Sequence, residues 1–308
     1  MKILSKREIA DFFGTSVEKL GSSFDKLYDS LDMSYELVQR EEEEELILGI
    51  LKRIGSDKQV VGSPERTDVW HNGWSENLLT FRETQNKSAI TPKFIRPGNI
   101  IRLGGHFVRP SNPFFERDYA KLLQYYVYDN FITDDIENVY EFGCGSGFNL
   151  LNLAAIKPEL NLYGSDFVNS SVELVNEVGS HFDLNIKAEL FNMLHPDYAY
   201  EIKENSCMFT HGSIEQLAGN VQNFINFAVL KKPKICFHLE PVVEVYDDTN
   251  LLDYLQIKFH LKRGYTVGLT SYLEKLQDEG KIKDFKCRRT WFGSKFMEGY
   301  TLISWRPA

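Results

Sequence analysis

Apolar and polar positions alternate along the second half of the chain in a pattern that predicts strands and helices in turn. Short apolar runs that end in glycine or an acid predict strands beginning at Val139 and at 160–166, 186–190, 207–210 and 234–239. Helical spacing predicts helices at 149–155, 169–181, 215–230 and 250–262, with 272–278 as an extension of the last. Strands that alternate with helices imply a parallel sheet with right-handed crossovers.

The end and the first part of the chain carry different patterns. Two strands are predicted at 284–291 and 300–305, joined by a short loop, which indicates an antiparallel hairpin. Residues 1–60 show helical spacing and predict a helical accessory segment, in which the run Glu41 to Glu45 reads as a solvated helix face. Residues 61–118 are rich in glycine, proline, asparagine and aromatics and predict a linker or lid that contributes to a substrate pocket. An aromatic helix is expected at 119–131, at the start of the domain that runs to 308.

Composition narrows the class of protein. The 308 residues are 43% hydrophobic, so a substantial core can form. A formal charge of −9 without a basic block disfavours a nucleic-acid partner. The four cysteines are widely spaced, predict buried thiols in a reducing cytosol and suggest no metal site. No secretory leader or membrane span is apparent, so a cytoplasmic protein is expected.

A glycine motif follows the strand that begins at Val139. It reads Glu141-Phe-Gly143-Cys144-Gly145-Ser-Gly147, with a glycine at every second position. Glycines here let a strand turn into a helix while the backbone approaches a ligand, so the motif predicts a nucleotide-like cofactor. A dinucleotide-binding loop has its third glycine one position later. Asp166 ends the next predicted strand, where a carboxylate can accept hydrogen bonds from ribose hydroxyls.

Together these features resemble the class I S-adenosylmethionine (SAM) dependent methyltransferase superfamily. The resemblance implies an α/β fold: a mostly parallel, seven-stranded Rossmann-like sheet flanked by helices and closed by an antiparallel hairpin. It implies SAM as cofactor, with the backbone from Glu141 to Gly147, Cys144 included, lining its methionine and ribose parts. A salt bridge or helix cap is the alternative role for Glu141.

Other strand ends supply further candidate cofactor contacts, because ligands of such sheets lie beyond the carboxyl ends of the strands. Phe167 is placed to cover one face of adenine, although it fits a core position equally well. By resemblance, Asn192 and Met193 would lie beside the adenine ring, with a turn before Pro196 as the alternative for Asn192. Thr210, at the end of the fourth strand, is a further candidate contact.

Candidate catalytic groups follow the fourth and fifth strands. His211, beside the flexible Gly212, is a candidate general base, because an imidazole titrates near neutral pH. A buried structural histidine is the competing interpretation. Glu240 and Glu244 are expected to face the pocket and to orient a cationic acceptor by charge-assisted hydrogen bonds.

The leading hypothesis is therefore methyl transfer from SAM to nitrogen or oxygen of a small polar metabolite, a class that includes cationic ones. The alternatives are methylation of a protein or peptide side chain, an NAD(P)-linked oxidoreductase that uses the same glycine loop, and a SAM-binding protein without turnover. No membrane partner is expected. The sequence leaves the acceptor and the oligomeric state open, a homo-oligomer included.

Overall fold

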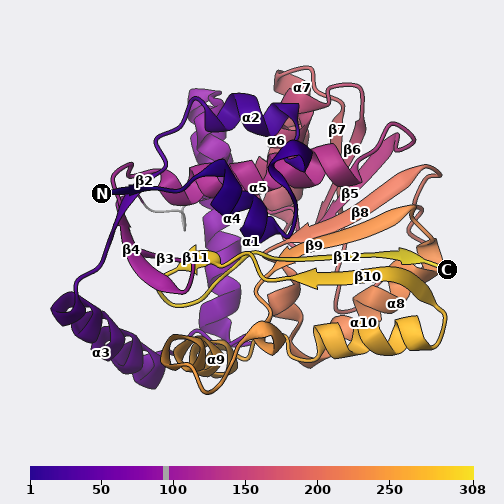
Figure 1. Cartoon of the computed structure of the whole chain (residues 1–308). Helices are drawn as coiled ribbons and strands as arrows, with labels where there is room; N and C mark the ends of the chain where they lie inside the picture. Colours follow the sequence, from indigo (N-terminus) through magenta and orange to yellow (C-terminus); the bar gives the residue numbers. More distant parts are fainter. Residues whose placement is uncertain (93–96) are drawn as a thin grey trace.

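A seven-stranded sheet forms the centre of the computed structural model, which describes residues 1–92 and 97–308. Its strands run in the spatial order β10-β12-β9-β8-β5-β6-β7 (Figure 1). In chain order they are β5 (Asn138–Phe142), β6 (Asn161–Asp166), β7 (Ile186–Leu190), β8 (Ser206–His211), β9 (Ile235–Glu240), β10 (Ile282–Arg288) and β12 (Thr301–Pro307).

Strand directions in this sheet confirm the predicted fold class. The strands from β9 to β7 are parallel, whereas β12 pairs antiparallel with both β9 and β10. Thr301 lies opposite Glu240, so the start of β12 reaches the edge of the sheet at which the parallel strands end. The expected terminal hairpin is thus present, with its last strand inserted between β9 and β10.

Helices cover both faces of the sheet because side chains alternate along each strand. On β5, Val139 joins a core cluster with α5 and α6, whereas Tyr140 and Phe142 pack on the opposite face with α8 and α10. The helices that follow residue 114 are α5 (Phe115–Phe131), α6 (Phe148–Ile156), α7 (Asn169–His181), α8 (Val221–Lys231), α9 (Leu251–Arg263) and α10 (Leu269–Asp278), with short 3₁₀ turns η3 (Ile214–Asn220) and η4 (Val243–Val245).

A second sheet corrects the expectation of a purely helical N-terminal segment. Its five strands are antiparallel, in the order β1-β2-β4-β3-β11: β1 (Lys2–Ile3), β2 (Ser34–Leu37), β4 (His106–Pro110), β3 (Ile101–Leu103) and β11 (Phe292–Ser294). The helices α1 (Lys6–Phe13), α2 (Ser22–Tyr28) and α3 (Arg40–Ser56) alternate with β1 and β2, and η1 (Val17–Lys19) lies between α1 and α2. The strand β11 comes from the loop of the terminal hairpin, so this sheet joins the two ends of the chain.

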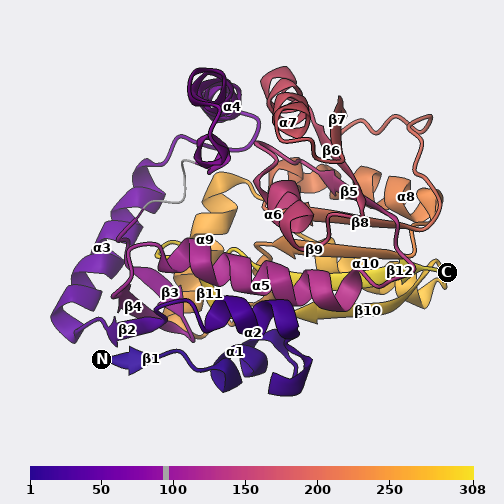
Figure 2. The same ribbon diagram turned by 90° about the horizontal axis from the view of Figure 1, so that it is seen from above.

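The segment expected to be an irregular linker or lid contains a long helix instead. Helix α4 (Pro64–Thr84) begins with Ser63 as its N-cap and Pro64 in its first turn, and η2 (Lys87–Ile90) follows it. Trp70, Trp74, Leu78 and Phe81 recur at helical spacing. The helix packs along α7 (Figure 2), where Arg82 forms ion pairs with Glu173 and Glu177.

Two further expectations concern membrane-spanning helices and the cysteine thiols. Within the described ranges, no helix is long and apolar enough to cross a membrane. All four cysteines are free; Cys144, Cys207 and Cys236 are buried as expected, whereas Cys287 is half-buried.

Candidate functional site

The glycine motif forms the turn from β5 into α6, at the edge where the parallel strands end. Gly143, Gly145 and Gly147 have φ angles of +74°, +52° and +76°, which side chains rarely allow. Two backbone amides of the turn, those of Gly143 and Cys144, donate to the carbonyl oxygen of Ser165 at 2.7 and 3.0 Å. The end of β6 therefore holds the shape of the glycine loop.

Asp166 lies directly beneath this loop. Its Oδ2 accepts a hydrogen bond from the Gly145 amide at 2.9 Å, and its Oδ1 accepts one from the Val168 amide at 3.0 Å. Burial raises the pKa of this carboxyl, against the lowering effect of the two amides. Each carboxylate oxygen has two acceptor sites, so ribose hydroxyls can still use the remaining lone pairs. The ribose contact stays a prediction, and the structure adds a second role in shaping the loop.

Glu141 is the buried acid of the motif. Its Oε1 accepts a hydrogen bond from Asn149 Nδ2 at 2.6 Å, but its Oε2 has no partner among the described residues. Burial, reinforced by nearby Asp166, raises the pKa of Glu141 to about 8. A buried acceptor without a donor is costly, so the site suits a ligand that brings an N–H group or a positive charge.

Helix α4 covers the glycine loop. A Cβ atom on Gly145 would lie 2.6 Å from the ring of Trp74, which stacks on Trp70 with ring centroids 5.8 Å apart. Trp70 Nε1 and Arg66 Nε both donate to Gln216 Oε1, at 3.4 and 3.0 Å, so this end of α4 is attached to η3. A ligand that approaches Gly145 from this side must displace the Trp74 ring.

The remaining candidate cofactor contacts differ in their surroundings. Phe167 is 49% exposed and meets the ring of His71 edge-on, so it is not a core residue. Asn192 closes a turn, because its Oδ1 accepts from the Leu194 amide at 2.9 Å, while the Met193 side chain reaches Gly143. Of these three side chains, Met193 reaches the loop and Asn192 adopts the turn that was its alternative role, and the ligand role of all three stays a prediction.

Two other candidates are enclosed by protein. The Cys144 side chain packs against Gly164, so only the backbone of this residue belongs to the loop. Thr210 is fully buried, and its Oγ1 lies 2.9 Å from His238 Nδ1, while Trp305 Nε1 donates to His238 Nε2 at 3.0 Å. Thr210 therefore joins a polar group inside the sheet, which is a structural role.

His211 lies beside Tyr300, which in turn lies within electrostatic reach of Glu116; the sequence singled out neither of these two residues. Its ring meets the ring of Tyr300 edge-on at 5.5 Å, and Glu116 at the start of α5 acts electrostatically on Tyr300. Burial lowers the pKa of His211 to about 4 and raises that of Glu116 to about 7. We call His211, Tyr300 and Glu116 the acceptor cluster. Glu116 was missed because only the fold brings the start of α5 to the end of β8.

The structure corrects the expectation for Glu240. Its carboxyl group is completely buried beneath the turn after β8, where it accepts from the amides of Ser213 and Ile214 at 3.0–3.1 Å. Burial and the adjacent carboxyl group of Glu215 raise its pKa. The side chain faces this turn and not a pocket, because two amide donors there compensate the carboxyl group for its burial.

The structure also corrects Glu244. Its Oε1 accepts from the amide of Gly268, immediately before α10, so this exposed carboxylate holds a loop at the start of a helix. The amide attracts the carboxylate away from the end of β9. Both carboxylates therefore bond to backbone amides in this arrangement, which does not support the acceptor-orienting role expected for them.

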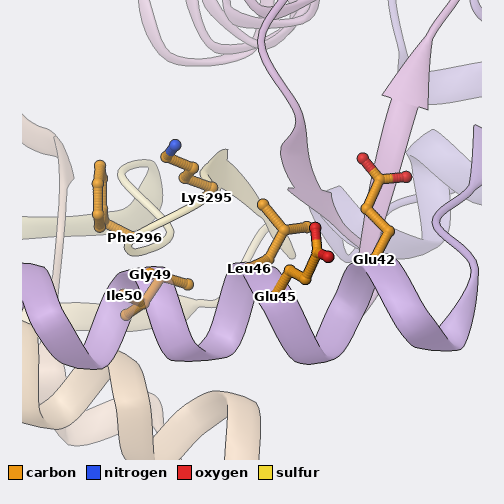
Figure 3. A pocket seen from close by; sticks show the side chains of 7 residues that line it. All are labelled: Glu42, Glu45, Leu46, Gly49, Ile50, Lys295 and Phe296. Atoms are coloured by element: carbon orange, nitrogen blue, oxygen red, sulfur yellow. The ribbon is translucent and has the colours of Figure 1, made fainter.

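One cavity lies away from the glycine loop. It has a volume of about 300 Å³ and is formed by α3 and the loop after β11 (Figure 3). Its lining residues are Glu42, Glu45, Leu46, Gly49, Ile50, Lys295 and Phe296. None of them belongs to the glycine loop or the acceptor cluster, so the candidate site does not depend on this cavity.

Comparisons with known proteins find similarity in structure only. No family model matches the sequence, and no curated protein matches it. The structure of the [4+2]-cyclase SpnF has a TM-score of 0.50 at 15% identity, over 77% of this chain and 95% of that one. Geranyl diphosphate C-methyltransferase from Streptomyces coelicolor A3(2) has a TM-score of 0.49 at 10% identity, over 80% of this chain and 99% of that one.

Topology and comparison agree on the architecture. The parallel strands, the terminal antiparallel hairpin and the glycine loop after β5 are the features that the sequence pattern predicted, and the structure adds the position of β12 between β9 and β10. The likeness to SpnF extends over nearly all of that protein. This chain therefore has the fold of the class I, Rossmann-like methyltransferases.

Proposed function

We propose that the protein is a SAM-dependent methyltransferase that acts on nitrogen or oxygen of a small polar metabolite. The observation that carries this proposal is the glycine loop at the carboxyl edge of the sheet, with buried Asp166 beneath it and an unpartnered oxygen of Glu141 beside it. The glycine loop, the two acids Glu141 and Asp166, and the strand order together favour SAM over a dinucleotide. Loops that bind dinucleotides have a different glycine spacing.

Residues of this chain would hold the cofactor at three places. The backbone from Gly143 to Gly147 would face its methionine part, Asp166 would accept from the ribose hydroxyls, and Phe167 would contact the adenine ring. The unpartnered oxygen of Glu141 suits the ammonium group of the methionine part, because a buried carboxylate gains most from a charged donor. When bound, SAM supplies an electrophilic methyl group on a sulfonium.

The acceptor cluster supports a polar acceptor. Beside the Tyr300 ring, His211 and Glu116 offer groups that can hydrogen-bond to a hydroxyl or an amine. Glu116 suits the role of general base at neutral pH, because its pKa is about 7. A large fraction of the group is then ionised at pH 7, and the carboxylate is still basic enough to take up a proton. A protonated amine would also be attracted to the Glu116 carboxylate.

Incubation of a cell extract with the protein and methyl-labelled SAM tests the activity. We expect label in small, polar molecules. Label in proteins would mean that the methyl acceptor is a protein side chain and not a small metabolite. Tight binding of SAM without any methyl transfer would favour a protein that binds SAM without turnover. The same assay is run with the Glu116→Gln variant. We expect its rate of methyl transfer to fall by about 10²-fold or more, because glutamine cannot act as the base.

Calorimetry tests the contact between Asp166 and ribose separately from the role of Asp166 in the loop. S-adenosylhomocysteine and its 2′,3′-dideoxy analogue are titrated into the protein and into its Asp166→Ala variant. We expect the variant to lose about tenfold or more in affinity for the natural ligand, and much less for the analogue. An equal loss for both ligands would mean that Asp166 only shapes the loop.

A further inference from the structure

Four side chains form a continuous hydrogen-bonded chain from the glycine motif to the acceptor cluster. Asn149 Nδ2 lies 2.6 Å from Glu141 Oε1, and Gln124 Nε2 lies 2.7 Å from Asn149 Oδ1. The same Gln124 nitrogen lies 3.3 Å from His211 Nδ1. The four residues come from β5, α6, α5 and β8, so the chain crosses the interior of the fold.

The direction of each hydrogen bond follows from the first one. The amide nitrogen of Asn149 donates to Glu141 Oε1, so the Asn149 oxygen faces Gln124 and accepts from its nitrogen. Asn152 Nδ2 donates to Gln124 Oε1 at 3.1 Å, which agrees with the nitrogen of Gln124 lying on the side of Asn149 and His211. A neutral Glu141 that carries its proton on the unpartnered Oε2 leaves the same order in place.

The order of donors fixes the tautomer of His211. The nitrogen of a glutamine side chain only donates, so His211 Nδ1 must carry the lone pair and the ring proton must lie on Nε2. Burial keeps the ring neutral, since it lowers the pKa of His211 to about 4. Within the described ranges, no residue accepts a hydrogen bond from Nε2, which leaves this N–H available to a ligand.

We infer that Gln124 and Asn149 are positioning residues that hold His211 as a neutral Nε2–H donor, which orients the methyl acceptor without removing its proton. The tautomer follows from the hydrogen bonds alone, whereas the use of the N–H group rests on the proposed methyl transfer. The inference replaces the role of general base expected for His211, and it leaves deprotonation to Glu116 or to water.

Nuclear magnetic resonance of protein labelled with ¹⁵N in its histidine rings tests the tautomer without any substrate. The signals of His211 are identified by their absence in His211→Gln, and the six other histidines report on the integrity of the fold. We expect an unprotonated Nδ1 and a protonated Nε2 at pH 7.5. A protonated Nδ1, or an equal mixture of the tautomers, would overturn the inference whether or not the protein transfers methyl groups.

The Gln124→Met variant tests the positioning role, because methionine keeps the length of the side chain and removes the amide. We expect both nitrogen signals of His211 to move toward the averaged position of two exchanging tautomers. Gln256→Met is the matched control, since Gln256 is also a buried glutamine but bonds to Asp253 and to the amide of Glu298 in another part of the fold. Unchanged His211 signals in Gln124→Met would contradict the inference.

Kinetics separates a donor from a base. Glutamine can donate from an amide but cannot take up a proton at neutral pH, whereas leucine can do neither. We expect His211→Gln to retain kcat within about tenfold and His211→Leu to lose about 10²-fold. Equal losses of 10²-fold or more in both variants would indicate a base and overturn the proposed use of the N–H group.

Discussion

At the scale of single residues, the candidate site depends on carboxyl groups that burial has made weakly acidic. Glu141 has one oxygen without a partner and Asp166 lies nearby, so ionisation of Glu141 in the free protein is unfavourable. Glycine residues complete the site, because their missing side chains leave room for close contacts at the loop. Both properties lead to predictions about ligand binding.

Binding of a cationic cofactor is expected to release a proton from Glu141. At pH 7 this carboxyl is mostly protonated, since its pKa is about 8, and a positive charge beside it lowers that pKa. The affinity for SAM should therefore increase with pH, by at most about tenfold per unit, and level off above pH 8. Calorimetry at pH 7 in buffers of different ionisation enthalpy measures the released proton. Heats of binding that are independent of the buffer, or unaltered in Glu141→Gln, would contradict this assignment.

Gly145→Ala should damage the loop and its contact with α4. The new Cβ would lie 2.6 Å from the ring of Trp74, on a backbone with φ of +52°. We expect a loss of stability of about 1–3 kcal/mol and weaker SAM binding, measured by urea unfolding and calorimetry. Gly73→Ala in α4 is the control, because a Cβ there meets open space and should stabilise the helix by about 0.5–1 kcal/mol. Similar stability of both variants would show that Trp74 does not rest on the loop in solution.

At the scale of secondary structure, the sequence predicted elements best where local signals and packing agree. The ranges expected for α7 and β7 agree with the structure, because an amphipathic helix and a short apolar run are bounded there by polar turns. Helix α4 was missed because the glycines, prolines, asparagines and aromatics of residues 61–118 were taken as signs of irregular chain. The strands β1, β3 and β11 are two or three residues long and are fixed by partners distant in the sequence, which no local pattern reveals.

The same division applies to the site. The glycine loop and Asp166 were predicted from their spacing, whereas the roles proposed for Glu116 and Gln124 depend on the position of α5 against the ends of the strands. Glu240 and Glu244 were misplaced because their position after β9 does not reveal which backbone amides attract their carboxylates. Local sequence therefore located the cofactor loop, and tertiary structure was needed for the groups around the acceptor.

The attachment of α4 to α7 should depend on apolar contact more than on charge. Phe81 is buried with Leu174 and Val178, whereas the ion pairs of Arg82 with Glu173 and Glu177 are exposed and contribute about 0–1 kcal/mol. We expect Phe81→Ala to cost about 3 kcal/mol and to accelerate amide exchange throughout α4, and Arg82→Ala to cost less than about 1 kcal/mol. Hydrogen exchange with mass spectrometry measures both variants. Equal acceleration in the two would mean that charge holds the helix.

At the scale of the whole molecule, the two sheets share one hydrophobic core. Leu4 and Ile9 from the N-terminal part belong to the same cluster of buried residues as Val139 and Leu162 of the seven-stranded sheet. Helix α5 lies between the seven-stranded sheet and the helices α1 and α2 (Figure 2), and its Tyr119 stacks on Phe292 of β11 at 3.8 Å. Residues 1–60 are thus an integral part of the fold.

We expect the protein to unfold in one cooperative transition, because removal of either sheet exposes the core of the other. In scanning calorimetry the van't Hoff and calorimetric enthalpies should agree. Phe292→Ala should lower the midpoint of the whole transition, at a cost of about 3–5 kcal/mol. The prediction is falsified if two separate transitions are observed, or if the variant shifts only one part of a broadened transition.

The position of β11 also has a consequence for the newly made protein on the ribosome. Strand β3 leaves the exit tunnel early, but β11, the strand that pairs with its outer edge, follows about 190 residues later in the chain. At typical elongation rates that delay is on the order of 10–40 s. During this time the edge of β3 has no strand to cover it, so the nascent chain needs protection from aggregation. Truncated products that end before β11 should therefore be bound by chaperones or degraded.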